Sequence, residues 1–340
     1  MPRLSGGDRL GDRATGRLKR CDLHLHTRHS CWKHLRVIRA RDSYTDPLLA
    51  FDRAKAAGMD FVAFTDHESI DGALRVLEAR PERAGEVIVG EEIETRFPET
   101  GQWLHVSAFG LDEARHREIQ RLRPDVRELV AYLRSERLLY VLNHPFQSFH
   151  FQIPARAFAR EIFQLFGHVE AGNATMSAAH QAAATALVGL SAAAGRPLVA
   201  VAGSDAHVPD HIGSAWTEAP GTTATEFLAS VERGDCSWSC RPLGFMRLVS
   251  HVHRAIGRYY LEALAPGGAA DLTALNRLAG LALIPGTLLG VPALLTSLNR
   301  LRQETVSRLV RRSLEGAAVE STGVDASLPA EAPAPVEGMD

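Results

Sequence analysis

Short apolar runs alternate with amphipathic stretches over the first two thirds of the chain. Each run is rich in β-branched residues and is followed by a polar loop and a helix-like stretch. We predict seven strands, over residues 21–27, 60–67, 86–94, 103–110, 138–145, 168–173 and 197–207. Helices are predicted between them, for example over 46–58, 125–138 and 174–195, with Gly58 and Gly195 at helix C-termini. Alternating strands and helices favour a parallel sheet, and seven such units can close an α/β barrel.

The pattern changes after about residue 244, where strand signals end and helical ones continue. With 340 residues, 45% of them hydrophobic, the chain can bury a barrel core and an appendage. We therefore predict a disordered lead-in over 1–18, a catalytic barrel over 19–244, a helical extension over 245–315 and a disordered tail over 316–340.

Residues that can bind metal ions occur at or near the C-terminal side of six predicted strands. In a parallel barrel these strand ends share one rim, where active sites are built. Residues two apart on a strand, such as His24 and His26, point to the same face and can grip one ion. An isolated histidine is more often a core or surface residue, but here polar side chains end apolar strands. The candidates are His24, His26, Asp66, His67, Glu92, His105, His144, Asp205 and His207.

Imidazole and carboxylate groups together favour zinc, manganese or iron, whereas magnesium prefers a mostly oxygen site. A carboxylate such as Glu92 can bridge two ions, and two neighbouring ions can activate water and neutralise a phosphate. The ligand set thus favours hydrolysis over redox chemistry or group transfer.

Six motifs in this order resemble the PHP (polymerase and histidinol phosphatase) family. They are DLHLHT (22–27), TDH (65–67), GEEIE (90–94), His105, NHP (143–145) and GSDAH (203–207), with HVEAGN (168–173) as a softer match through Glu170 and Asn173. The resemblance covers roughly residues 20–210. It implies a distorted seven-stranded β/α barrel of the PHP type, with two or three metal ions that hydrolyse a phosphoester.

The resemblance also implies a role for each ligand. One ion would be held by His24, His26, Glu92 and Asp205. Glu92 would bridge to a second ion, completed by His105 and His144, while His67 and His207 would contribute to a third. Among these residues we expect Glu92, Asp205 and His207 to be catalytic.

The chain departs from the family pattern directly after the first motif, where Cys31 stands in place of the third-site aspartate. A Cys31 thiolate ligand, recruitment of another group and an empty third site remain open alternatives. The loop that follows is long and basic. It is either a solvated loop or a flap that grips phosphate through Arg28, Lys33 and Arg36.

The formal net charge of −2 is too small to hold a long polyanion by its field alone. We therefore expect a small phosphorylated substrate and no strong nucleic-acid binding. The N-terminus lacks the apolar core of a signal peptide, and the four cysteines form no disulfide ladder, which predicts a cytoplasmic protein. The spacing of Cys236 and Cys240 is a weak metal signal, with ordinary packing as the alternative.

No charged residue occurs from Leu278 to Asn299, and arginines flank this segment. It is long enough to span a bilayer, but Pro285 and Pro292 would interrupt a continuous helix. The alternatives are a helical hairpin packed on the barrel, peripheral membrane contact through basic flanks, and a true span.

These observations favour a metal-dependent phosphoesterase acting on a small phosphorylated metabolite or a nucleotide. Two alternatives are an exonuclease-like activity on oligonucleotide ends and a regulatory module that holds metal without turnover. A third is a metal-dependent amidohydrolase, which the Glu92 and NHP motifs argue against.

Overall fold

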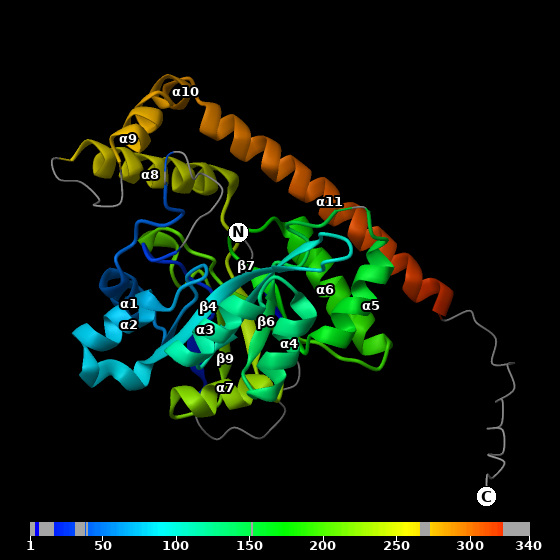
Figure 1. Cartoon of the computed structure of the whole chain (residues 1–340). Coiled ribbons are helices and arrows are strands. Elements are labelled where there is room, and N and C mark those ends of the chain that lie inside the picture. Colours follow the sequence, from blue (N-terminus) through cyan, green and yellow to red (C-terminus); the bar gives the residue numbers. More distant parts are fainter. Residues whose placement is uncertain are drawn as a thin grey trace, which may run out of the picture.

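Ten strands form a single sheet in the computed structural model, which describes residues 4–6, 17–30, 38, 40–150, 152–265 and 273–321 (Figure 1). The strand order is β1-β10-β9-β2-β3-β4-β5-β6-β7-β8. The strands are β1 (Leu4–Gly6), β2 (Lys19–Asp22), β3 (Phe61–Phe64), β4 (Val87–Arg96), β5 (Trp103–Phe109), β6 (Tyr140–Asn143), β7 (His168–Asn173), β8 (Val199–Gly203), β9 (Ala215–Ala219) and β10 (Ser237–Cys240). The seven predicted strands correspond to β2–β8.

Strands β2–β8 make a nearly closed barrel, because the chain beyond β2 meets the chain beyond β8. Leu25 forms a parallel bridge with Ala206, and the amide of Asp205 donates to the carbonyl of His24 at 2.7 Å. Below this contact, the Thr217 hydroxyl of β9 bonds the backbone of Ala202 in β8. The closure therefore brings the HxH and DxH motifs side by side at one rim.

The prediction of an all-parallel, seven-stranded sheet is wrong in two respects. The sheet has ten strands, and β5 runs antiparallel to both β4 and β6. A parallel crossover needs a dozen or more residues, but only a tight turn over 97–102 joins β4 to β5. The start of β5, with His105, consequently lies at the same rim as the ends of the parallel strands.

The three additional strands extend the sheet beyond the barrel in antiparallel fashion. β9 pairs with β2, β10 pairs with β9, and β1 pairs with β10. They span only three to five residues each and contain several serines, threonines and glycines, so their strand signal in the sequence is weak. β1 lies within the stretch that was predicted to be a lead-in.

Eleven α-helices and two short 3-10 helices occur in the described residues, and several of the α-helices begin at a capping side chain. Asp46 accepts from the amides of Leu48 and Leu49 at the start of α1, and Ser177 caps α6. Gly58 and Gly195 follow α1 and α6 with φ of 88° and 70°, as predicted. The helices are α1 (Pro47–Ala56), α2 (Asp71–Ala79), α3 (Glu113–Leu122), α4 (Val126–Ser135), α5 (Ala155–Leu165), α6 (Ala178–Ala193), α7 (Ala224–Glu232), α8 (Phe245–Leu264), α9 (Ala274–Leu281), α10 (Ile284–Leu288) and α11 (Val291–Ser321).

The C-terminal extension consists of α8–α11 and shares the core of the barrel. Val306, Val310 and Leu314 of α11 are buried in the same hydrophobic cluster as side chains of α4, α5 and α6. Figure 1 shows α11 running along α6 and α5, while α8, α9 and α10 lie over one end of the barrel. The helix extends six residues beyond the predicted boundary at 315.

The uncharged segment 278–299 is divided among α9, α10 and the start of α11. Among the described residues, no single helix is long and apolar enough to cross a membrane. Residues Ala274–Leu288 and Val291–Gly316 pass that test only as a pair, which is bent by 76°.

Candidate metal centre

The barrel rim brings together all eight predicted metal ligands. His24 and His26 follow β2, His67 follows β3, Glu92 and His105 lie on β4 and β5, His144 follows β6, and Asp205 and His207 follow β8. They form four overlapping groups in which potential ligand atoms lie within 4.8 Å of one another: His24–Glu92–His144, His24–His26–Asp205, His67–Glu92–His105, and His26–Asp42–His67–His207. Asp66 is in none of these groups and instead accepts the Thr27 hydroxyl at 2.7 Å.

Glu92 lies between two sets of imidazole rings and is almost fully buried. Its Oε2 is 3.3 Å from Nε2 of both His24 and His26 and 3.2 Å from Nδ1 of His67. Its Oε1 is 3.1 Å from His144 Nε2 and 3.3 Å from His105 Nδ1. Each carboxylate oxygen thus faces its own set of nitrogens, which is the arrangement that a bridging ligand needs.

Asp205 contributes one oxygen to the rim and has the other held in place. Its Oδ1 lies 3.4 Å from His26 Nε2 and 3.5 Å from His207 Nδ1. Its Oδ2 accepts from the Thr175 hydroxyl at 2.9 Å and from the Asn173 amide at 3.2 Å. Asp205 and His144 both have left-handed backbones, with φ of 52° and 23°, a conformation that is costly for these residues and common at functional sites.

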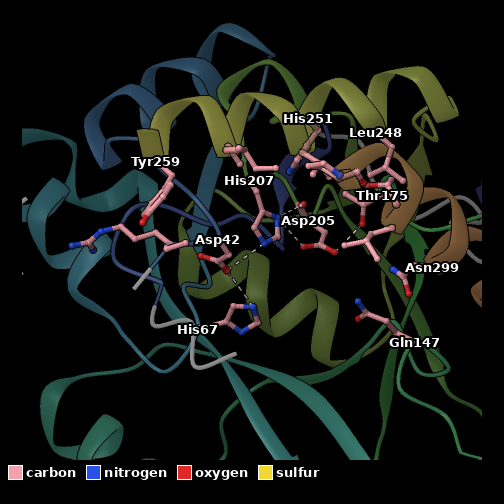
Figure 2. Close-up of a pocket in the computed structure, with 18 of the residues that line it drawn as sticks. Asp42, His67, Gln147, Thr175, Asp205, His207, Leu248, His251, Tyr259 and Asn299 are labelled. Carbon is pink, nitrogen blue, oxygen red and sulfur yellow. Dashed lines mark hydrogen bonds and ion pairs between the residues drawn. The ribbon is translucent and has the colours of Figure 1, made fainter. Parts of the chain in front are cut away.

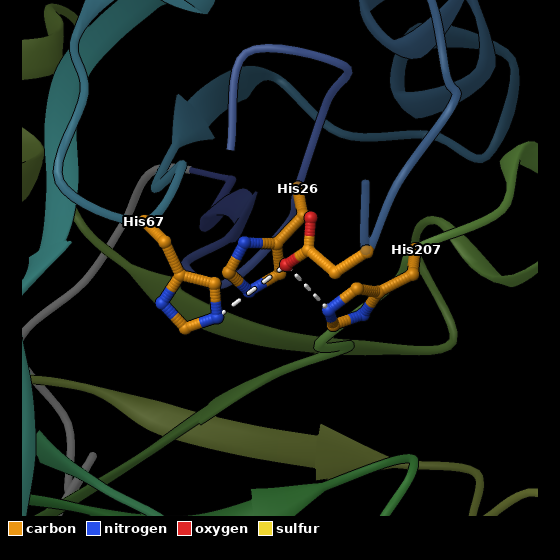
Figure 3. Close-up of side chains that lie close together, drawn as sticks. His26, His67 and His207 are labelled. Carbon is orange, nitrogen blue, oxygen red and sulfur yellow. Dashed lines mark ion pairs between the residues drawn. The ribbon is translucent and has the colours of Figure 1, made fainter. Parts of the chain in front are cut away.

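A fourth group contains an aspartate that the sequence interpretation missed. Asp42 Oδ2 lies 3.5 Å from His67 Nε2 and 3.3 Å from His207 Nε2. Figure 3 shows the rings of His26, His67 and His207 gathered around this position. This fourth group therefore includes a carboxylate, Asp42, which the interpretation based on Cys31 did not anticipate. Cys31 itself lies outside the described residues, as do Lys33 and Arg36.

Hydrogen bonds from outside the rim fix the orientation of several ligands. His24 Nδ1 lies 2.9 Å from Glu170 Oε1, His26 Nδ1 lies 3.0 Å from Ser30 Oγ, and the Asn143 amide donates to Glu92 Oε1 at 2.8 Å. A ring that donates Nδ1–H to a carboxylate keeps its Nε2 lone pair for a metal. Asp22 has a different role, since it accepts from the amides of His24, Ser204 and Gly213 and ties β2 to the chain after β8.

The donor set fits divalent cations. His24 Nε2 and His26 Nε2 face each other at 3.1 Å, while the other ring nitrogen of His24, Nδ1, lies 2.9 Å from Glu170 Oε1. Asp42 Oδ2 is buried and makes no hydrogen bond to any described residue. Converging ring nitrogens and a buried carboxylate oxygen without a hydrogen bond are costly unless a cation lies among them.

The charges of the rim groups also indicate a site for divalent cations. Burial opposes protonation of His26, but hydrogen bonds with Asp205 and Glu92 outweigh it and raise its pKa to about 10. Burial opposes ionisation of Glu92, but the rings of His24 and His67 hold its pKa well below the usual range. Carboxylates likewise raise the pKa values of His24 and His105, whereas burial lowers that of His67 to about 3. Protons on His24, His26 and His105 thus balance the carboxylates, and bound cations would replace those protons.

A cavity of about 860 Å³ opens above the rim and is roofed by the C-terminal extension. Asp42, His67, Glu92, His105 and Asp205 lie at its floor, and residues of α8, α10 and α11 line its other side. Figure 2 shows Leu248, His251 and Tyr259 of α8 above Asp42, His67 and Asp205, with His251 next to His207. The roof is fastened to the barrel by His251, whose Nδ1 is 2.9 Å from that of His211, and by the Arg254–Asp210 ion pair.

Of the two arginines described in the loop after β2, Arg41 lines this cavity and Arg28 does not. Arg28, a predicted phosphate contact, lies 3.3 Å from Glu262 of α8 and is not among the residues that line the cavity. Arg41 does line it and donates to the carbonyl of Arg28 at 2.6 Å. Within the described residues, Cys236 and Cys240 belong to no metal-capable group and are buried among hydrophobic side chains.

Gly203→Ala should destabilise the protein and lower its metal content. A methyl group on Gly203, at the end of β8, would lie 2.3 Å from His24 Cβ and 2.6 Å from His24 N, so β2 and β8 would have to separate at a ligand. We expect the free energy of unfolding to fall by about 1–3 kcal/mol. Gly189→Ala on α6 is the matched control, since no described atom lies within 4 Å of its new methyl group. Urea denaturation and metal analysis of both variants test this. Equal free energies of unfolding and equal metal contents in the two variants would contradict it.

Comparison with known proteins gives one family match and several remote likenesses. Residues 189–236 match the family model PHP_C, described as PHP-associated. An uncharacterized protein of Methanocaldococcus jannaschii, MJ1587, is 34% identical over 76 residues, which are 22% of this chain and 44% of that protein. The chain thus spans under half of the length of this curated relative.

The solved structures that resemble this chain share little sequence with it. One is a two-domain protein from Bacteroides vulgatus that contains a predicted PHP-like metal-dependent phosphoesterase (15% identity, 71% of this chain and 70% of that chain, TM-score 0.47). Another is an amidohydrolase from Chromobacterium violaceum with bound sulfate and no metal (16% identity, 68% and 96%, TM-score 0.41). The matched model covers the segment that carries the GSDAH motif, and together with the ordered motifs before it this match supports a PHP-domain family for the chain.

Proposed function

We propose that the protein is a metal-dependent phosphoesterase, with Glu92 as the bridging ligand of its centre. The observation that carries this proposal is the placement of the two Glu92 oxygens, each 3.1–3.3 Å from a different set of imidazole nitrogens. Zinc, manganese and iron suit such nitrogen and carboxylate donors. Divalent ions held there would supply Lewis acidity and neutralise phosphate charge.

The residues of the chain would prepare this chemistry in three ways. Glu92, Asp205 and Asp42 would supply negative charge to the cations, and His207 would complete the position that Asp42 shares. Glu170, Thr175 and Asn173 would hold their partner ligands in a fixed orientation. Helices α8, α10 and α11 would limit the access of bulk water to the rim from above.

A substrate screen tests the proposed function. Protein loaded with manganese, zinc or iron would be assayed with phosphomonoesters, phosphodiesters, nucleoside bisphosphates and short oligonucleotides. Turnover of at least one class that is lost on chelation and restored by metal supports the proposal. Tightly bound metal without turnover of any class would contradict it and favour a regulatory module.

We also propose that the tip of the extension contacts anionic membrane surfaces. Leu288, the last residue of α10, and Leu289, which follows it, are 82% and 85% exposed. Leu288→Ser/Leu289→Ser should reduce flotation with anionic vesicles by at least about tenfold, because burial of each leucine contributes a large part of interfacial affinity. Leu49→Ser, an exposed leucine on α1, is the control. Equal flotation of the wild type and both variants would count against membrane contact.

A further inference from the structure

The roof of the cavity presents an apolar surface to the metal-capable rim. On α8, residues that recur every three or four positions line the cavity and are half-buried, among them Leu248, Val252 and Ile256. Val291 and Leu295 line it from α11. A ligand at the rim would therefore have carboxylates and imidazoles on one side and aliphatic side chains on the other.

Several polar atoms of the roof are already engaged within the protein. The Tyr260 hydroxyl lies 2.9 Å from the Thr287 hydroxyl, and the Thr296 hydroxyl donates to the carbonyl of Pro292 at 2.7 Å. Arg300 donates to the carbonyl of Thr175 at 3.1 Å. These groups of the roof are therefore not free to bind hydroxyl groups of a ligand, and each buried hydroxyl without a partner lowers affinity.

The cavity is larger than a site for phosphate alone would need to be. Its volume of about 860 Å³ is in the range of cavities that enclose an organic ligand of drug size. A phosphate group placed among Glu92, Asp205 and Asp42 would leave the part below α8 and α11 to the remainder of the molecule.

On the basis of the function proposed above, we propose that the substrate is a phosphate monoester whose alcohol is a long apolar group lying against α8 and α11. Water adds to phosphorus, the bond between phosphorus and the ester oxygen breaks, and that oxygen takes up a proton. The products are inorganic phosphate and the apolar alcohol. The roof would select this class because contact with an alkyl chain removes apolar surface from water on both sides.

The chain-length dependence of turnover tests this proposal. Ethyl, butyl, hexyl and octyl phosphate carry the same headgroup, and all would be used with metal-loaded, full-length protein at concentrations where octyl phosphate is monomeric. We expect kcat/KM to rise by up to about fourfold for each added methylene, the factor that burial of a methylene allows. From ethyl to octyl phosphate the gain should be at least about 50-fold.

Matched variants test whether the preference for longer alkyl chains depends on the roof. Leu295 lines the cavity and its neighbour Leu294 is not among the lining residues, yet they are 59% and 58% exposed. On α8, Ile256 lines the cavity, whereas Leu261 is 65% exposed and is not among the lining residues. The double variant Ile256→Gln/Leu295→Gln should lose most of the preference for octyl over ethyl phosphate. The control Leu261→Gln/Leu294→Gln should keep it.

The outcomes separate this proposal from the proposed function. Equal kcat/KM for ethyl and octyl phosphate would overturn the apolar substrate and leave a phosphoesterase. A preference for octyl phosphate that both double variants retain would overturn the role of the roof. Metal binding without turnover of any of the four esters, together with turnover of hydrophilic phosphoesters in the screen, would overturn the inference alone. Turnover of no phosphoester would overturn both.

Discussion

Glu92→Gln should lower turnover of any phosphoester substrate by at least about a hundredfold while the barrel remains folded. The amide keeps the size of the carboxylate but presents one oxygen and one NH₂ group, so it cannot offer a negatively charged oxygen to each of the two imidazole sets. The NH₂ group would face ring nitrogens that must remain unprotonated to bind metal. We therefore expect loss of at least one ion per chain in metal analysis.

The neighbouring residue provides a matched control for this substitution. Glu91 is also buried on β4, but its side chain lies on the opposite face of the strand and bonds His116 and Gln120 at 2.9 Å each. Glu91→Gln makes the same chemical change without touching the rim, so metal content should stay at the wild-type value. More than about a tenth of the wild-type rate in Glu92→Gln, with all metal retained, would exclude the bridging role.

The barrel strands were predictable because their signals are local. Residues 61–64, 140–143 and 199–203 are short apolar runs, and the helices before them, α1, α4 and α6, each begin at a capping side chain. Neither strand identity nor order therefore depended on tertiary contacts. The direction of β5 depended on the loop before it. The six residues from Phe97 to Gln102 include a proline and a glycine, which is the composition of a hairpin turn rather than of a crossover.

Most of the metal-capable residues at the rim were predictable for a related reason. The ends of the strands meet at one rim in any such barrel, whatever the sequence of the connecting segments. To predict that His24, Glu92 and Asp205 lie at the rim, it was enough to assign the strands and to apply the two-residue repeat of side-chain direction along a strand. Asp42 could not be found in this way, because the described residues around it, 40–46, belong to no strand or helix. Its one local signal is that it is the first carboxylate after the DLHLHT motif. A helical hairpin packed on the barrel was one of the alternatives for 278–299, but helical sequence alone does not say that α8 lies over the rim or which of its faces lines the cavity.

Asp42→Asn should remove about one metal ion per chain, and Cys31→Ser should remove none. Asp42 Oδ2 lies among the nitrogens of His67 and His207, and the neutral amide would leave this position without the negative charge that offsets a buried dication. The fold should survive, because asparagine can still accept the bond that Asp42 Oδ1 receives from the Ser43 amide at 2.7 Å.

Metal content by mass spectrometry, with manganese and zinc loaded separately, tests the prediction on three variants. Asp46→Asn is the control in the same loop, since Asp46 belongs to no metal-capable group and asparagine caps a helix about as well as aspartate. A carboxylate ligand is compatible with manganese, whereas a thiolate would favour zinc. If Cys31→Ser loses an ion and Asp42→Asn does not, the thiolate holds the third position, and the geometry around Asp42 is only an ion pair with His67 and His207.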